Sequence, residues 1–196
     1  MNRKDVNNLA SQSYQLPYIS LMTVLCIYFI SLYVYFNKLA AKNTKQKSEI
    51  TQEIFDEIEE ISKDVANVEI TQDKIKITLP SDIVFNLGDS SIKKELEPVL
   101  KKLAKTFKLL PEEYLIIFEG HTDNSPVWYG GNFFSNWELS AYRALSLQYF
   151  FVDEGIKPEK MRIVGYGEFK LLFQNDTEEH KTANRRVEII LKKRGK

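Results

Sequence analysis

The sequence predicts an α/β domain, with helices packed on a sheet, preceded by a single transmembrane helix and a helical spacer. Three observations predict this fold: an uncharged run at 17–36, a charged stretch with a helical apolar stripe at 37–67, and alternating strand-like and helix-like segments at 68–196. Strands that alternate with helices place those helices on the faces of a sheet. A chain of 196 residues, 43% of them hydrophobic, can form one globular domain and little more.

The uncharged run reads PYISLMTVLCIYFISLYVYF and is twenty residues long. At about 1.5 Å of rise per residue, a helix of that length spans roughly 30 Å of hydrocarbon. Tyr18 and Tyr35, near its ends, would lie in the aromatic interface belts. A cleaved signal peptide fits less well, because the run is too long and no small-residue cleavage site follows it. We expect a membrane anchor, with 1–16 as a cytoplasmic segment.

The charges around this run favour the opposite orientation. The basic residues that flank it are Arg3 and Lys4 before, and Lys38, Lys42, Lys45 and Lys47 after. The positive-inside rule alone would therefore place the C-terminus in the cytoplasm. The rule is weak for a long translocated domain, and the expected ligand overrules it below.

The spacer at 37–67 carries one narrow apolar stripe. Its members recur at spacings of four, four, three and four: Ile50, Ile54, Ile58, Ile61 and Val65. A stripe of this kind on a charged helix needs a partner. The helix could fold back on its own domain or associate across a dimer, and we favour the dimer. The same stretch could serve as a plug.

The remaining segments predict the domain in chain order. Ile75, Ile77 and Leu79 alternate as one face of a strand. The later elements are a helix at 91–109, a buried strand at 115–120, a helix at 137–153, a turn at 155–158, a strand at 162–165, a long loop, and a last strand at 186–191.

The loop after Gly120 is the candidate site. Thr122 and Asp123 emerge where such sheets present their ligand sites, and the return of the loop could bring Arg143 close to Asp123. A carboxylate and a guanidinium that face one pocket can grip a zwitterion, such as an amino acid presented at its free end. The alternative is a direct Asp123–Arg143 salt bridge that fixes the loop. The residues alone leave both open.

Four motifs then carry a resemblance: GHTDNSPV at 120–127, SNWELSAYRA at 135–144, GYGE at 165–168 and NRRVEI at 184–189. In this order and spacing they resemble the peptidoglycan-binding domain of the outer-membrane-protein-A family. The second motif is most similar to the flagellar stator B-subunit branch, which is MotB-like. The resemblance covers the expected domain, 68–196, and implies a mixed sheet of the OmpA C-terminal kind.

The resemblance also implies a site. In that family the Asp of the TD pair and the Arg of the LSxxRA stretch bind the diaminopimelate of the peptidoglycan stem peptide. Those residues correspond to Asp123 and Arg143, with Thr122, Asn136 and Arg186 expected beside them. The implied partner is peptidoglycan. Neither catalysis nor a cofactor is implied.

Other readings of these residues are weaker. His121 could act as a base beside Asp123, with Ser125 or Ser135 as nucleophile, but no spacing marks a nucleophile elbow. His121, Asp123 and Glu119 suggest a metal cluster, but we expect alternate side chains on a strand to face opposite ways, so no metal ion is expected.

Two compositional features restrict the partners. Lys+Arg and Asp+Glu both number 27, so no net charge attracts nucleic acid, and none is expected as a partner. The only cysteine, Cys26, excludes a disulfide or a cysteine-based metal site within one chain. The aromatic residues of the loop could stack on sugar rings or plug the core, and both remain open: Trp128, Phe133, Phe134 and Trp137.

The membrane run carries a weaker resemblance. ISLMTVLCIYF is similar to the stator stretch in which an acid before LMT carries the transported ion, and Ser20 stands at that position. A serine hydroxyl does not ionise near neutral pH. Without the acid, we expect only the anchoring half of the stator function to remain.

The sequence therefore predicts a non-enzymatic inner-membrane protein, expected to form a homodimer, whose periplasmic domain binds peptidoglycan. Because peptidoglycan lies outside the cytoplasmic membrane, the domain must lie there too. The alternative is an ion-conducting stator B subunit of a flagellar or phage-defence motor, paired with an A-type subunit.

Overall fold

The computed structural model describes four stretches of the chain: 21–39, 53–71, 74–127 and 132–194. The chain divides into two compact units, Met1–Ile50 and Thr51–Lys196, and each is described by itself. Ser20 and Trp128 lie outside the described residues, as does Ile50 of the spacer stripe.

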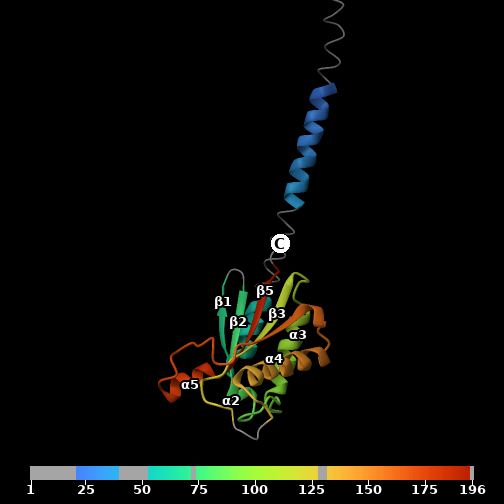
Figure 1. The fold of residues 1–196 in the computed structure, drawn as a ribbon. Coiled ribbons are helices and arrows are strands. Elements are labelled where there is room, and N and C mark those ends of the chain that lie inside the picture. The colour runs from blue at the N-terminus through green and yellow to red at the C-terminus, as the bar shows by residue number, and fades with distance from the viewer. Residues whose placement is uncertain (1–20, 40–52, 72–73, 128–131, 195–196) are drawn as a thin grey trace, which may run out of the picture. The chain divides into compact units, whose positions relative to one another are not determined.

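The described part of the first unit is a helix at 21–39 (Figure 1). This helix, Leu21–Leu39, is long and apolar enough to cross a membrane, with a mean hydropathy of 1.4. Its large apolar side chains, such as Leu21 and Ile27, are exposed. Such a surface is stable in hydrocarbon and costly in water, which is consistent with the expected anchor.

The second unit is built on a five-stranded sheet in the order β1-β2-β5-β3-β4 (Figure 1). Its strands are β1 (Asn67–Ile70), β2 (Lys74–Pro80), β3 (Tyr114–Gly120), β4 (Met161–Gly165) and β5 (Arg186–Lys193). Only β3 and β4 pair in parallel, and the other neighbours are antiparallel. The predicted mixed α/β fold is therefore confirmed. The strand predicted from Ile75, Ile77 and Leu79 is β2, and the residues just before it form a separate strand, β1, that pairs with it as a hairpin.

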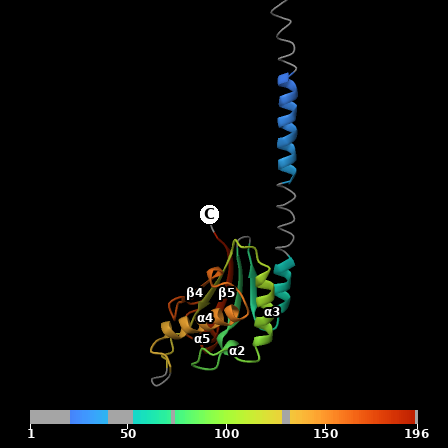
Figure 2. The same cartoon turned by 90° about the vertical axis from the view of Figure 1, so that its right-hand side faces the viewer.

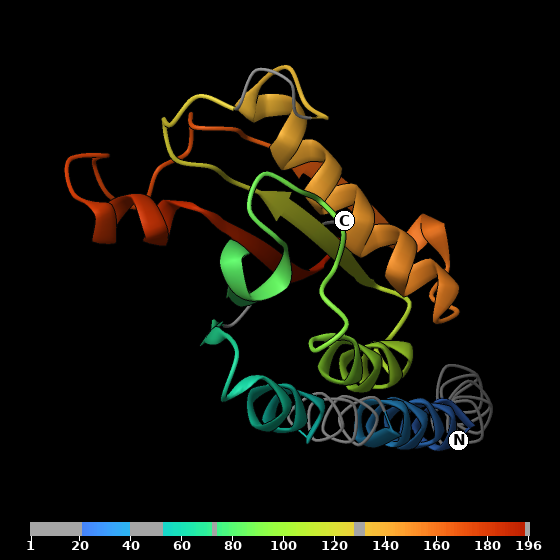
Figure 3. The same ribbon diagram turned by 90° about the horizontal axis from the view of Figure 1, so that it is seen from below.

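Two long helices, α3 (Glu97–Lys108) and α4 (Asn136–Asp153), cover one face of the sheet (Figure 3). Phe151 of α4 joins them to the sheet, because its ring centroid lies 5.3 Å from those of both Phe107 and Phe118. The shorter elements are α2 (Ser81–Val84), the 3-10 turn η1 (Pro158–Lys160) and α5 (Glu178–Asn184). The sequence reading missed α5 inside the long loop.

Helix α3 begins later than predicted. The expected helix started at residue 91, but Ile92 instead forms an isolated bridge with Phe85, and α3 starts at Glu97 with a proline in its first turn. Proline fits this position because the first helical N–H groups have no partner within the helix. The segment before α3 thus stays extended and is available to the site described below.

The spacer stripe lies in the core of this unit. Residues 53–62 are helical beside α3 (Figure 2), and Ile54 and Ile58 belong to the same buried cluster as the strands. Ile61 and Val65 pack against that cluster. The stripe thus follows the alternative in which the helix folds back on its own domain, because these side chains are already covered within the chain. The compact unit begins near Thr51.

Candidate functional site

The end of β3 and the start of α4 lie against each other. A Cβ at Gly120 would lie 2.0 Å from the backbone oxygen of Ser140, so only glycine permits this contact. Helix α4 is capped at its N-terminus by Ser135, whose side chain accepts a hydrogen bond from the N–H of Glu138. The contact brings Arg143, in the second turn of α4, toward the loop that follows β3.

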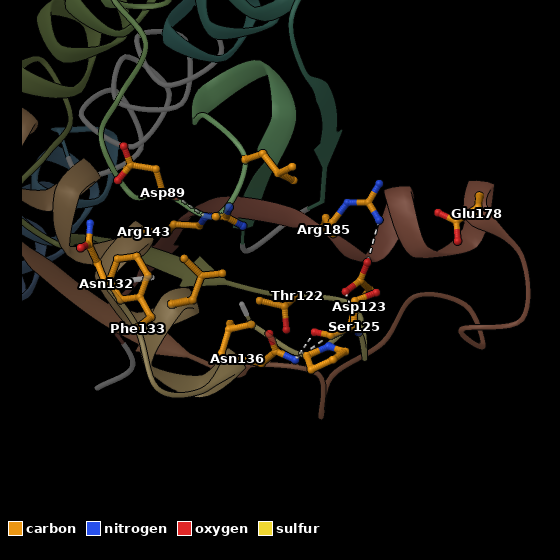
Figure 4. Close-up of a pocket in the computed structure, with 15 residues that line it drawn as sticks. Asp89, Thr122, Asp123, Ser125, Asn132, Phe133, Asn136, Arg143, Glu178 and Arg185 are labelled. Atoms are coloured by element: carbon orange, nitrogen blue, oxygen red, sulfur yellow. Dashed lines mark hydrogen bonds and ion pairs between the residues drawn. The ribbon is translucent and has the colours of Figure 1, made fainter. Parts of the chain in front are cut away.

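A pocket of about 870 Å³ opens at this junction (Figure 4). The predicted residues Thr122, Asp123, Asn136 and Arg143 all line it. The remaining lining residues are Leu87, Gly88, Asp89, Ser125, Pro126, Val127, Asn132, Phe133, Leu139, Glu178 and Arg185. They come from the segment before α3, the loop after β3, α4, and the region of α5, so the pocket depends on the whole fold.

Asp123 is buried and already hydrogen-bonded. Its Oδ1 accepts the N–H of Ser125 at 2.9 Å, and its Oδ2 pairs with Nη1 of Arg185 at 2.6 Å. Arg185 also donates from Nη2 to the hydroxyl of Thr182 at 2.6 Å. The carboxylate is thus held in one orientation at the pocket wall.

Arg143 is also buried, with 5% of its surface exposed, but its partners are neutral. Its Nε donates to the backbone oxygen of Asp89 at 2.9 Å, and its guanidinium lies 5.3 Å from the ring centroid of Phe85. Desolvation lowers the pKa of Arg143 to about 10, although the charge of Asp89 raises it. The side chain therefore stays charged at neutral pH.

The terminal nitrogens of Arg143 remain available. Within the described stretches, neither Nη1 nor Nη2 has a hydrogen-bond partner, and no carboxylate forms a salt bridge with Arg143. The direct Asp123–Arg143 bridge considered from the sequence is therefore not formed. A guanidinium whose two terminal NH2 groups face a pocket can bind a carboxylate through two parallel hydrogen bonds.

Thr122 and Asn136 have different roles in the pocket. The buried Thr122 hydroxyl has no hydrogen-bond partner among the described residues, so it can bond to a ligand. The side-chain amide of Asn136 donates to the backbone oxygens of Asp123 and Ser125, at 3.3 and 2.9 Å, and to Glu168 at 3.0 Å. Asn136 therefore braces the loop around Asp123.

Arg186, which the resemblance placed beside these residues, is not among those that line the pocket. It is 2% exposed, and its Nε pairs with Oε1 of Glu188 at 2.6 Å. Its neighbour Arg185 lines the pocket instead. Consecutive residues at the start of a strand point to opposite faces, so one arginine of the pair reaches the pocket and the other does not. The sequence offered both without indicating which.

Arg186 belongs to a second group of ionisable side chains, all buried except the exposed Lys170, which we call the salt-bridge cluster: Glu119, His121, Lys170, Arg186 and Glu188. Nζ of Lys170 lies 2.6 Å from Oε2 of Glu119. Burial raises the pKa of Glu119, but His121, whose Nε2 lies 3.7 Å from Oε2, and the hydrogen bond from Lys170 outweigh it and lower the pKa to about 2.

Side-chain atoms of Glu119, His121 and Glu188 that could coordinate a metal ion lie within 4.8 Å of one another. The expectation that alternate side chains on this strand would diverge was wrong, because residues two apart on a strand share a face. Both carboxylates already have a cation beside them, Lys170 and Arg186, so the cluster needs no metal ion for charge balance.

The nucleophile alternative finds no support in the same geometry. The Ser135 hydroxyl caps α4, and the ring of His121 stacks on Tyr166 at 5.2 Å. In the part of the chain that the structure describes, neither Ser125 nor Ser135 forms a hydrogen bond with His121.

Two of the loop aromatics, Phe134 and Trp137, do not plug the core. Phe134 is 94% exposed and Trp137 is 57% exposed, with the Trp137 ring against Phe169 at 5.0 Å. Phe133 lines the pocket beside Tyr142. Of the two readings left open by the sequence, core plugging therefore fails for Phe134 and Trp137.

Comparison with known proteins identifies the family of this chain. The OmpA family matches residues 84–185. Motility protein B of Bacillus subtilis is 35% identical over 127 residues, 64% of this chain and 48% of that protein. Outer membrane protein A of Bordetella avium is 32% identical over 114 residues, 58% of this chain and 56% of that protein. The chain thus spans about half the length of these relatives.

Solved structures show the same fold. A putative MotB-like protein from Desulfovibrio vulgaris superimposes with a TM-score of 0.69 and 27% identity, covering 76% of this chain and 96% of that one. The periplasmic domain of Helicobacter pylori MotB gives a TM-score of 0.61 and 27% identity, covering 66% and 83%. The chain belongs to the OmpA family, and it is MotB-like within that family.

Proposed function

We propose that this chain anchors a membrane assembly to peptidoglycan. The Thr51–Lys196 unit binds the stem peptide through the zwitterionic end of its diaminopimelate residue, and the Leu21–Leu39 helix holds the chain in the inner membrane. The observation that carries this proposal is Arg143, which is buried and charged in the pocket across from Asp123 and whose two terminal nitrogens have no partner among the described residues.

The pocket matches the two charges of such a ligand. Arg143 offers Nη1 and Nη2 to the ligand carboxylate in a bidentate arrangement. Asp123 offers a carboxylate to the ammonium group, and the unpaired Thr122 hydroxyl supplies a further hydrogen bond. The free end of one amino acid carries both charges close together, so it can pair with Arg143 and Asp123 at the same time.

The ligand also decides the orientation. Peptidoglycan exists only outside the cytoplasmic membrane, so the second unit lies in the periplasm and the 1–16 segment in the cytoplasm. This orientation is opposite to the one that the basic residues after the anchor favour. Their influence is weak when a long domain is translocated.

A second candidate function is an ion-conducting stator B subunit that forms a dimer and works with an A-type subunit. The similarity to Motility protein B favours it. Against it stands Ser20, since the run at 17–36 contains no Asp, Glu, Lys, Arg or His to carry an ion. Co-expression of the parent chain or a Ser20→Asp variant with an A-type subunit, followed by measurement of proton influx, decides this. Influx through the parent would support the motor.

The anchoring function is tested by co-sedimentation with purified peptidoglycan. The fragment 51–196 is suitable because it contains Ile54 and Ile58, which complete its core. We expect the parent fragment to sediment with peptidoglycan and both Asp123→Ala and Arg143→Ala to remain in the supernatant. Arg162→Ala, at an exposed site on β4, is the matched control and should sediment like the parent. If both pocket variants sediment like the parent, the pocket is not the binding site.

A further inference from the structure

The carboxylate assigned to the ligand's ammonium group is paired with a cation of the chain itself. Oδ2 of Asp123 lies 2.6 Å from Nη1 of Arg185, and Oδ1 accepts the N–H of Ser125. Figure 4 shows Arg185 and Asp123 facing each other, joined by this ion pair. Both carboxylate oxygens therefore have a donor before any ligand arrives.

The two partners differ in how firmly they are placed. The Asp123 side chain is 6% exposed, whereas that of Arg185 is 31% exposed. Arg185 is also tied to Thr182 by a single hydrogen bond from Nη2. An arginine that is partly in water can leave its partner at much lower cost than a buried one, because water replaces the lost interaction.

An incoming ammonium group would share the single Asp123 carboxylate with Arg185. Two cations beside one buried carboxylate repel each other. Glu178, on α5, lines the same pocket with an exposed carboxylate whose ion pair with Lys181, at 3.4 Å, is screened by water, so that it can also accept a released Arg185. Charge repulsion would therefore favour the release of Arg185 from Asp123, and the Glu178 carboxylate offers it another partner in the same pocket.

We propose that Arg185 is the resident counter-ion of Asp123, that the ligand's ammonium group displaces it, and that Arg185 thereby determines how strongly the pocket distinguishes zwitterionic from purely anionic ligands. This inference rests on the proposed function. Arg143 has no such competitor, because its Nη groups are unpaired among the described residues. The ligand carboxylate therefore binds without displacing a side chain. The binding free energy of the ammonium group is only the difference between its own ion pair with Asp123 and the Asp123–Arg185 pair that it replaces.

Isothermal titration calorimetry with the full-length chain in detergent micelles tests this. The probes are a stem tripeptide that ends in meso-diaminopimelate and the same tripeptide with 2-aminopimelate, which keeps the carboxylate but lacks the side-chain ammonium group. We expect Arg185→Gln to bind the zwitterionic tripeptide roughly fivefold more tightly than the parent, because the competing ion pair is gone. Its affinity for the 2-aminopimelate tripeptide should change less than about twofold.

A double-mutant cycle separates competition from a structural effect. In an Asp123→Asn background no carboxylate remains to compete for, so Arg185→Gln should leave the affinity for the zwitterionic tripeptide unchanged. Should Arg185→Gln fail to fold, as shown by its thermal melting curve, Arg185→Lys replaces it. Lysine cannot hold Asp123 and Thr182 at once, so we expect a tightening of about twofold.

Equal or weaker binding of the zwitterionic tripeptide by the Arg185 variant would overturn the inference, since Arg185 would then support the site or contact the ligand. That result leaves the proposed function intact, because the parent still binds. If the parent bound neither tripeptide nor peptidoglycan, the proposed function and this inference would both be wrong.

Discussion

The pocket and the salt-bridge cluster both bury charged side chains, but they treat those charges differently. In the cluster, Nζ of Lys170 lies 2.6 Å from Oε2 of Glu119, and Nε of Arg186 lies 2.6 Å from Oε1 of Glu188. In the described part of the pocket, the buried Arg143 hydrogen-bonds only to a backbone oxygen, lies beside an aromatic ring and forms no salt bridge, although Asp89 and Asp123 act on it from a distance. Burial of a charge does not by itself mark a binding site. A buried charge without a directly paired counter-ion is a better indicator of one.

The pKa values express the same contrast. Burial raises the pKa of Glu119, but the nearby His121 and the hydrogen-bonded Lys170 lower it to about 2, so the fold stabilises its charged form. Desolvation lowers the pKa of Arg143 to about 10, so the fold disfavours its charged form. For an acid a lowered pKa means a favoured charge, whereas for a base it means a disfavoured one. A ligand carboxylate would pair with Arg143 and stabilise its charged form.

The largest effect on stability should come from breaking a pair in the cluster. Glu188→Ala leaves Arg186 buried at 2% exposure without its carboxylate. We expect the free energy of unfolding of the 51–196 fragment to fall by about 3–5 kcal/mol in urea denaturation. The double variant Arg186→Met with Glu188→Leu removes both charges and should recover most of the loss. A loss below about 1 kcal/mol for Glu188→Ala would mean that the cluster is not structural.

The second-largest effect on stability should come from low pH, which protonates Glu119 in the salt-bridge cluster. Glu119 has a pKa lowered from 4.5 to about 2, so its contribution is complete above the unfolded value and is lost as the pH falls through the folded value. The expected loss between pH 4.5 and 2 is roughly 3 kcal/mol, and solvent screening is small because 9% of the side chain is exposed. Unfolding free energies measured against pH for the parent and Glu119→Gln check this. Identical pH dependence in both proteins would contradict it.

A smaller effect should follow from loosening the contact between the two regions. The hydroxyl of Ser140 accepts the buried N–H of Gly167 at 2.9 Å, on the same loop that carries Lys170 to the cluster and Glu168 to Asn136. Ser140→Ala should lower the free energy of unfolding by about 1–2 kcal/mol, because the N–H loses its partner. Ser140→Cys keeps a weak acceptor and should lose less. Equal stability of Ser140→Ala and the parent would show that the contact does not couple them.

The smallest effect should come from an exposed ion pair. Lys181 lies 3.4 Å from Glu178, whose side chain is 78% exposed. Lys181→Ala should change the free energy of unfolding by less than about 0.5 kcal/mol, because water screens the pair. A thermal melt is sufficient to measure this. A loss comparable to that of Glu188→Ala would mean that burial does not distinguish the pairs.

Much of the fold follows from local patterns in the sequence. The alternation of Ile75, Ile77 and Leu79 predicted β2, and the apolar run ending at Gly120 predicted β3, because both depend on which face is buried. The spacer stripe was equally visible, but a stripe does not state which surface covers it. Only the tertiary structure places Ile54 and Ile58 in the core of their own unit.

The candidate site was predicted less completely. Asp123 and Arg143 were named because they stand after a strand and in the next helix, and both line the pocket. Choosing Arg186 over Arg185 depended on a side-chain direction that is set where α5 gives way to β5. Since α5 itself was missed, the sequence could not supply that direction. Lys170 was missed because its partner Glu119 lies 51 residues away in the chain.

The most direct test of the central claim is the affinity of the Arg143→Gln full-length chain for the meso-diaminopimelate tripeptide, measured by isothermal titration calorimetry. The account predicts a loss of about 100-fold, because the ligand carboxylate loses its charged partner, with a melting temperature equal to or above that of the parent, because a disfavoured buried charge is removed. An affinity within about threefold of the parent would contradict it.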